Sequence, residues 1–123
     1  MKAERGELFM PNTIIDDRLQ ALGVTKNYKG YHKLKLVIEL ALEDEEKLYS
    51  VSKNLYQPIA EKCGCSAGSI SRNIRTVIDN IWKNNYHNLC VIAGLKLTEK
   101  PTVTQFISLL VANVQRSSMV SAV

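Results

Sequence analysis

The sequence has few cysteines, no long apolar run and no apolar segment near its N-terminus. Its three cysteines are an odd number, which argues against a framework of disulfide bonds. The first residues, MKAERGELFMPN, include acidic side chains and lack the apolar core of a secretory signal. No apolar stretch approaches the length of a membrane-spanning helix. We therefore expect neither an exported disulfide-rich protein nor a membrane protein, but a cytoplasmic one.

The composition is that of one folded domain with a modest basic surplus. The 123 residues are enough for one core and too few for two ordinary domains. Hydrophobic residues make up 46% and charged residues 23%, which excludes a disordered chain. The net charge of +4 is compatible with a polyanionic partner, but simple solubility explains it equally well. The partner must therefore be inferred from motifs.

Apolar residues recur at helical spacing along most of the chain. This spacing predicts a helix over 12–22 and a strongly amphipathic helix over 31–42. Asp44 can cap a further helix, and capping explains the acidic run 43–46 better than a metal site does. A last helix is expected to begin at Pro101-Thr102.

Residues 89–97, LCVIAGLKL, do not show by their pattern which element they form. We favour a short buried helix or turn, because Gly94 would interrupt a strand and no second strand is available to pair with it. Residues 1–10 are expected to form a flexible leader and 117–123 a frayed tail. The predicted fold class is all-α, with about six helices in a single domain over residues 11–116.

Residues 58–83 have the pattern of a helix-turn-helix, central in the chain. Pro58 suits the first turn of a short helix, Gly64 ends that helix, and Ser66 can cap the next one. DNA-binding proteins insert the second helix of this motif into the major groove. The predicted second helix has an apolar stripe formed by Ile70, Ile74, Val77, Ile78 and Ile81.

The opposite side of this second helix carries small, hydroxylic and basic residues. Arginine can pair with guanine through two hydrogen bonds, and Ser, Thr and Asn can reach bases or phosphates. An ordinary solvated helix would carry similar residues, and spacing alone does not separate the two interpretations. The candidate DNA-binding residues, including two lysines for phosphates, are Lys62, Ser66, Gly68, Ser69, Ser71, Arg72, Asn73, Arg75, Thr76 and Lys83.

The cysteines near the turn raise two alternatives, a zinc site and a redox pair. Cys63, Cys65, His87 and Cys90 could supply a Cys3His set, but Cys-x-Cys is tighter than usual zinc spacing and the core needs no metal. A disulfide across one residue would be strained, and no neighbouring group would activate a thiol. We expect Cys63 to pack under the turn and Cys65 to lie near the surface. Neither His87 nor His32 has a catalytic partner in a motif, so we expect no metal, no cofactor, no small-molecule substrate and no enzymatic activity.

Three segments resemble the C-terminal effector domain of the sporulation initiation response regulator family. LGVTKNYKGYHKLKLVIELAL is similar to that family's IGV…KGY..LR.AI pattern. SVSKNLYQPIAEKCGCSAGSISRNIRTVIDNIW matches its Leu-Tyr, its Ile-Ala, its Ala-Ser opening and its Arg-x-x-Ile-Arg…Ile…Trp. TEKPTVTQFISLLV is similar to KPTN.EFI. The resemblance extends in register over most of the chain, so it is more specific than the helix-turn-helix pattern.

The resemblance implies a six-helix domain that binds double-stranded DNA at a short promoter box. It also implies pairing with a second copy on DNA through the last helix, and contact with RNA polymerase. Arg72 and Arg75 match arginines of the family's recognition helix. Ser69 stands where the family has Arg, Ser71 where it has Glu, and Thr76 where it has His. Each lost bidentate pair is worth about 1–3 kcal/mol of discrimination, so these positions leave the operator sequence and the affinity open.

The family's regulators carry an N-terminal receiver domain, for which residues 1–30 have no room. The chain is either a fragment of a longer regulator or a stand-alone protein, and the start MKAERGELF favours the second. We expect a DNA-binding transcription regulator; the alternative is a module that sequesters a full-length regulator and lacks salt-dependent affinity for DNA. A candidate dimer or partner surface is the apolar stripe Phe106, Ile107, Leu110 and Val111, although such stripes more often pack in a core.

Overall fold

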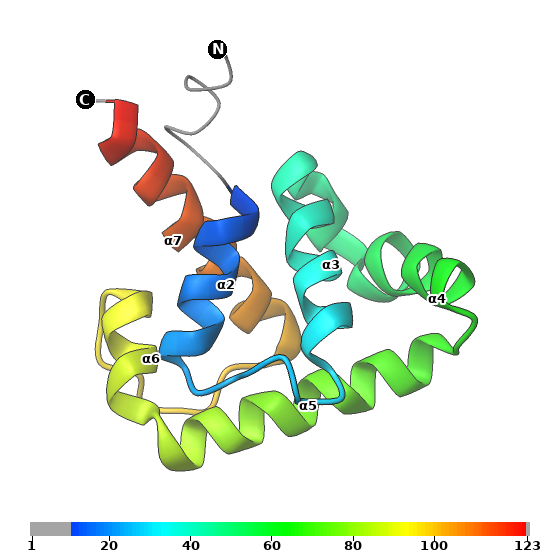
Figure 1. Ribbon diagram of the computed structural model, residues 1–123, viewed down its shortest axis with the longest axis horizontal. Coiled ribbons are helices and arrows are strands. Elements are labelled where there is room, and N and C mark those ends of the chain that lie inside the picture. The colour runs from blue at the N-terminus through cyan, green and yellow to red at the C-terminus, as the bar shows by residue number, and fades with distance from the viewer. Residues whose placement is uncertain (1–10, 123) are drawn as a thin grey trace.

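The computed structural model describes residues 11–122, with side chains over 13–117, and these residues are helical with short connections (Figure 1). No strand occurs in this described range, so the predicted all-α class is confirmed. The elements are α2 (Pro11–Ala21), α3 (Tyr31–Glu43), the 3-10 helix η1 (Glu45–Ser50), the π-helical turn η2 (Ser52–Tyr56), α4 (Gln57–Cys63), α5 (Ala67–Asn84), α6 (Tyr86–Ala93) and α7 (Val103–Ala122).

The ambiguous apolar segment resolves into a short helix and a loop. The helix α6 covers its first part, and Gly94 ends the helix in a left-handed conformation with φ of 78°. Glycine adopts this conformation without the steric clash of a Cβ atom. The loop then leads to α7, where Thr102 and Gln105 form a capping box: the Thr102 hydroxyl accepts from the Gln105 amide at 3.1 Å, and the Thr102 amide donates to Gln105 Oε1 at 2.9 Å.

The segment after Asp44 differs from the regular helix that we predicted. Asp44 does cap it, since its Oδ1 accepts from the amide of Glu46 at 3.1 Å. The backbone then forms a 3-10 helix and a π-helical turn before α4 begins. Pro58 lacks the amide that would bond one turn back, and its ring would crowd the carbonyl there. The irregular geometry therefore lies directly before the proline.

The core forms where α7 crosses α2, α3, α5 and α6. Phe106, Ile107, Leu110 and Val111 are all at most 2% exposed in this core. The predicted partner surface is therefore wrong, because the stripe is covered by the helices of the same chain. The helix α7 continues through Ala122, past Arg116, where we expected the tail to begin. The expected leader, residues 1–10, lies outside the described residues.

A polar network joins α2 to α3. The Tyr31 hydroxyl donates to Asp16 Oδ1, and Lys35 Nζ lies 3.0 Å from Asp16 Oδ2. Burial of the Asp16 carboxyl opposes its ionisation, but the hydrogen bonds from Tyr31 and Lys35 outweigh it and lower the pKa of Asp16 below its ordinary value of 3.8. Ionised Asp16 is thus favoured by folding.

Acidification should remove the stabilisation that Asp16 provides. Because the pKa of Asp16 is lower in the folded than in the unfolded state, its contribution is present above pH 3.8 and is lost as the pH falls through the folded-state value. Asp16→Asn should be about 1–3 kcal/mol less stable at neutral pH and lose less stability in acid. Urea unfolding across the acid range measures both, with the exposed neighbour Asp17→Asn as control. Equal acid sensitivity of wild type and Asp16→Asn would contradict the assignment.

Candidate nucleic-acid interface

The predicted helix-turn-helix is present, formed by α4, a three-residue turn and α5. Gly64 closes α4 with φ of 69°, and the amides of Gly64 and Cys65 both bond to the carbonyl of Ala60. Ser66 then caps α5: its Oγ accepts from the Ser69 amide at 3.1 Å, and the Ser69 hydroxyl donates to the Ser66 carbonyl at 2.9 Å. The stop at Gly64 and the cap at Ser66 are therefore confirmed.

The helix α5 buries one side and exposes the other. Its apolar stripe is at most 3% exposed. In Figure 1, α5 runs along one edge of the molecule, with the α2–α3 loop and the α6–α7 loop beside it. Its 18 residues correspond to roughly 27 Å of helix. The exposed residues of α5 on the side opposite the stripe are Gly68, Arg72, Arg75, Thr76, Asp79 and Lys83.

Arg72 lies on this exposed side, in the second turn of α5. Its Nη1 is 3.6 Å from the place that a Cβ on Gly68 would occupy, so the guanidinium extends back over the first turn. Within residues 13–117, Arg72 and Arg75 side chains make no hydrogen bond or ion pair. In a helix-turn-helix the first turns of the second helix contact base edges. Arg72 therefore carries an available charge in the part of the second helix that contacts bases in DNA-binding helix-turn-helix proteins.

Three of the candidate hydroxyl groups are already used inside α5. Ser66 and Ser69 cap each other's backbone, and the Thr76 hydroxyl donates to the Arg72 carbonyl at 3.1 Å. The Ser69 and Thr76 hydroxyls each use their single O–H donor in these bonds, but their oxygen lone pairs can still accept hydrogen bonds. They can accept from base amino groups but cannot donate to a phosphate.

Two candidates lie at the edges of α5 and do not face the same way as Arg72. Asn73 is half-buried against the α2–α3 loop, where a Cβ on Gly30 would come within 3.0 Å of Asn73 Cβ and 3.2 Å of its carbonyl oxygen. Ser71 is half-buried on the other edge, beside Tyr56. The structure thus brings Arg72, Gly68 and Thr76 onto one surface, and places Asn73 and Ser71 to either side of it.

The two candidate lysines are exposed at opposite ends of the motif. Lys62 is in the last turn of α4, just before the turn. Lys83 is eleven residues after Arg72, or roughly 16 Å along the helix axis. The major groove is about 12 Å wide, so Lys83 and Arg72 are too far apart to lie together in one groove.

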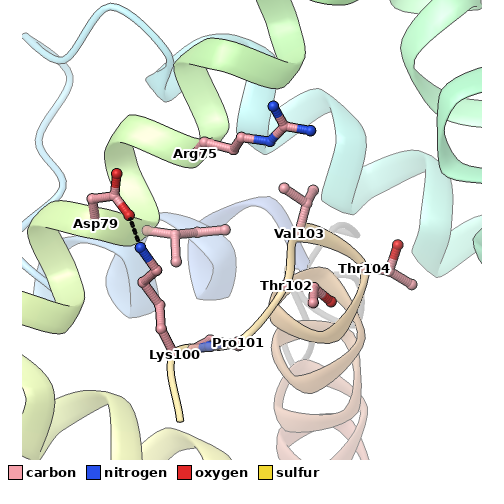
Figure 2. Close-up of a pocket in the computed structure, with 8 residues that line it drawn as sticks. Arg75, Asp79, Lys100, Pro101, Thr102, Val103 and Thr104 are labelled. Atoms are coloured by element: carbon pink, nitrogen blue, oxygen red, sulfur yellow. Dashed lines mark hydrogen bonds and ion pairs between the residues drawn. The ribbon is translucent and has the colours of Figure 1, made fainter.

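A lysine that sequence analysis missed lies beside the exposed side of α5. Figure 2 shows Lys100, from the α6–α7 loop, reaching Asp79, with a distance of 2.5 Å between Nζ and Oδ1. Both side chains are about half exposed. The pair neutralises an acid on the side of α5 that carries Arg72. The two residues are 21 positions apart, so no local sequence pattern predicts that they pair. The only signal in the sequence was that this loop contains the KPT segment of the family resemblance.

Removing Lys100 should weaken binding to any DNA duplex. Lys100→Gln leaves the Asp79 carboxylate uncompensated near the phosphates, a repulsion of about 1 kcal/mol or roughly fivefold in affinity at low salt. Stability should change by less than about 1 kcal/mol, because the pair is exposed. The double variant Asp79→Asn/Lys100→Gln should recover the affinity in an anisotropy titration. If it does not, Lys100 contacts DNA itself.

The cysteines are placed opposite to our expectation. Cys63 is exposed, and Cys65 is half-buried and packs against the core. The left-handed Gly64 turns the chain so that the last turn of α4 points outward and the residue after it points inward. Across residues 11–122, no three Cys, His, Asp or Glu side chains gather as metal ligands. In the same range, no helix is long and apolar enough to cross a membrane.

Comparison with protein families gives a match that covers most of the chain. Residues 15–114 match the family described as Sporulation initiation factor Spo0A C terminal. The matched range includes all of α3, α4, α5 and α6, and thus the whole helix-turn-helix. It ends within α7, after the buried stripe.

Proposed function

Since the chain belongs to the sporulation initiation factor C-terminal family, whose members are DNA-binding effector domains of response regulators, we propose that it is a sequence-specific transcription regulator. The helix α5 enters the major groove with its first turns. The observation that supports this best is the guanidinium of Arg72, exposed over Gly68 at the start of α5 and unpaired among the described residues.

Base recognition centres on Arg72 in this proposal. Its guanidinium donates to guanine O6 and N7, the commonest specific contact in the major groove. Gly68 has no side chain, so α5 and the DNA can approach closely there. The lone pairs of Ser69 and Thr76 accept from adenine N6 or cytosine N4. The preference therefore changes at the base pairs that relatives read with Arg and His, while the contact of Arg72, which matches a family arginine, keeps a preference for the family's promoter box.

The protein acts in the cytoplasm without catalysis, and its other partners are a second copy on DNA and RNA polymerase. Because the apolar stripe of α7 is in the core, a second copy that pairs through this helix would contact its other side. An open groove of about 380 Å³ lies there, lined by residues of α6 and α7 that include Ala93, Ser108 and Arg116. Arg116 is held in place by its hydrogen bond to the carbonyl of Ile92 at 3.1 Å.

Fluorescence anisotropy with two labelled duplexes tests the proposed function. One duplex carries the promoter box of the family and the other a scrambled box, and each is titrated at two salt concentrations. We expect preference for the box and affinity that falls steeply with salt. Equal, weak binding to both duplexes would contradict sequence-specific recognition. Absence of salt-dependent binding, with capture of a full-length regulator, would favour the sequestering module that Ser69, Ser71 and Thr76 also suit.

A further inference from the structure

A second groove lies along the other edge of α5. It has a volume of about 470 Å³ and is bounded by the η1–η2 segment, the first half of α5 and the start of α7. It is next to the groove of Figure 2, with which it shares Arg75, Val103 and Thr104. Among the described residues, its polar lining contains one cation and five hydroxyl groups, and no carboxylate: Ser50, Ser52, Tyr56, Ser71, Arg75 and Thr104.

The charge of Arg75 is available to a ligand in this groove. Arg75 is exposed, and within residues 13–117 its side chain has no ion pair or hydrogen bond. The acid one turn further on, Asp79, is paired with Lys100. Figure 2 shows the Arg75 guanidinium extending away from that pair, toward the side on which Val103 lies. An anion entering the groove would therefore meet an uncompensated guanidinium.

The hydroxyl groups of this groove differ from those elsewhere on α5. Ser66, Ser69 and Thr76 are used in caps and backbone contacts. In contrast, the hydroxyls of Ser50, Ser52 and Thr104 make no hydrogen bond with any residue whose side chain the structure describes, and the Ser71 hydroxyl interacts only with Tyr56. Each can donate to an acceptor that comes from outside.

Tyr56 supplies a buried hydroxyl beside Ser71, at a geometry short of a full hydrogen bond. The residue is 5% exposed, and its hydroxyl oxygen has no hydrogen-bond partner among the described residues. It lies beside Ser71 and Arg75, and its burial raises the pKa of Tyr56 to about 12, with both neighbours opposing that rise. The hydroxyl is thus a donor at neutral pH. When Ser71 donates to a ligand, its lone pairs can accept from Tyr56, which would satisfy both groups.

We propose that this groove binds one backbone phosphate of the DNA, with Arg75 as its clamp and the hydroxyls of Ser71 and Thr104 as further donors. A lining of donors without carboxylates fits a phosphodiester oxygen, and helices and side chains of this kind fix a protein's register on the duplex. The inference rests on the proposed function, because the groove opens beside the first turns of α5, where Arg72 reads bases. The inference assigns different roles to the two arginines: Arg72 recognises the base sequence, and Arg75 contributes affinity that does not depend on sequence.

Salt-dependent anisotropy distinguishes these two roles. Arg75→Ala should weaken binding to the preferred and scrambled duplexes by the same factor, about tenfold, and reduce the slope of log affinity against log salt by about 1. Thr104→Val, which removes a hydroxyl at nearly constant shape, should act in the same direction by about threefold. Lys96→Ala, in the α6–α7 loop, removes one exposed charge as a control and should act less. Loss of preference in Arg75→Ala, at an unchanged salt slope, would overturn the inference.

Neutral phosphate substitution locates the contact. A set of duplexes, each with one methylphosphonate linkage, should reveal a position at which wild-type affinity falls and Arg75→Ala affinity does not. Equal sensitivity of both proteins at every position would overturn the inference. A second result would also overturn it: inorganic phosphate shifts the amide resonances of Tyr56 and Ser71, but no methylphosphonate position affects binding. The groove would then bind a free anion and not the DNA backbone. A third outcome is that wild type binds both duplexes equally and still loses affinity at one methylphosphonate position in an Arg75-dependent way. That result would support the phosphate site and contradict only the proposed sequence-specific function.

Discussion

Replacing Arg72 with alanine should remove most of the difference in affinity between the preferred operator and a scrambled duplex. A bidentate arginine–guanine pair supplies about 1–3 kcal/mol of discrimination, which is roughly five- to 150-fold. Arg72 is exposed, and its guanidinium lies over Gly68 without a partner in the described part of the chain. Its loss should therefore lower affinity for the operator and leave the weak binding to the scrambled duplex nearly unchanged.

Two variants serve as controls for this result. Arg72→Lys keeps the charge but not the planar pair of donors, so it should retain non-specific affinity and still lack preference. Arg75→Ala removes a guanidinium one turn away and should lower the affinity for both duplexes by the same factor. Anisotropy at fixed salt measures all four proteins, and circular dichroism checks that α5 is intact. If Arg72→Ala weakens both duplexes by the same factor, Arg72 contacts a phosphate and another residue reads the bases.

Replacing Phe106 with alanine should destabilise the fold by about 3–5 kcal/mol, because it opens a cavity where α7 crosses the other helices. Phe106 is 0% exposed and is among the largest side chains of the core. Domains of this kind are stable by about 5–15 kcal/mol, so this loss is a large fraction of the total. Thermal and urea unfolding should both show it.

The same experiment separates a core role for the α7 stripe from an interface role. Loss of a core side chain lowers stability at every protein concentration, whereas loss of an interface lowers it in a concentration-dependent way. Ser108→Ala, on the exposed side of α7, is the matched control and should leave stability within about 0.5 kcal/mol. If the Phe106→Ala monomer is as stable as wild type but no longer self-associates, the stripe is an interface and not part of the core.

The helices and their ends follow from neighbours in the sequence. The stop at Gly64, the cap at Ser66 and the apolar stripe of α5 each depend on residues within one or two turns of each other. Hydrogen bonding and helical periodicity at this range are encoded locally, so they could be predicted. The segment between Asp44 and Pro58 could not be assigned its 3-10 and π geometry, because packing against α3 and α4 also acts on it.

The composition of the candidate interface was predictable only in part. Arg72, Arg75 and Gly68 are exposed on α5 as its periodicity predicts. Asn73 falls on the edge of the same helix, and the α2–α3 loop, which approaches at Gly30, decides that it packs inward. Helical position shows which side a residue faces, but not which loop covers that side.

The amino-acid sequence by itself determined that this protein is helical, where its helix-turn-helix begins and ends, and that two arginines lie on the exposed side of α5. Tertiary structure alone decided that the α7 stripe is core, that Lys100 neutralises Asp79, and that Tyr56 and Thr104 line one groove with Arg75. The physical reason is range. Caps and periodicity act between residues close in the chain, whereas burial and charge pairing depend on which distant segments meet when the core forms.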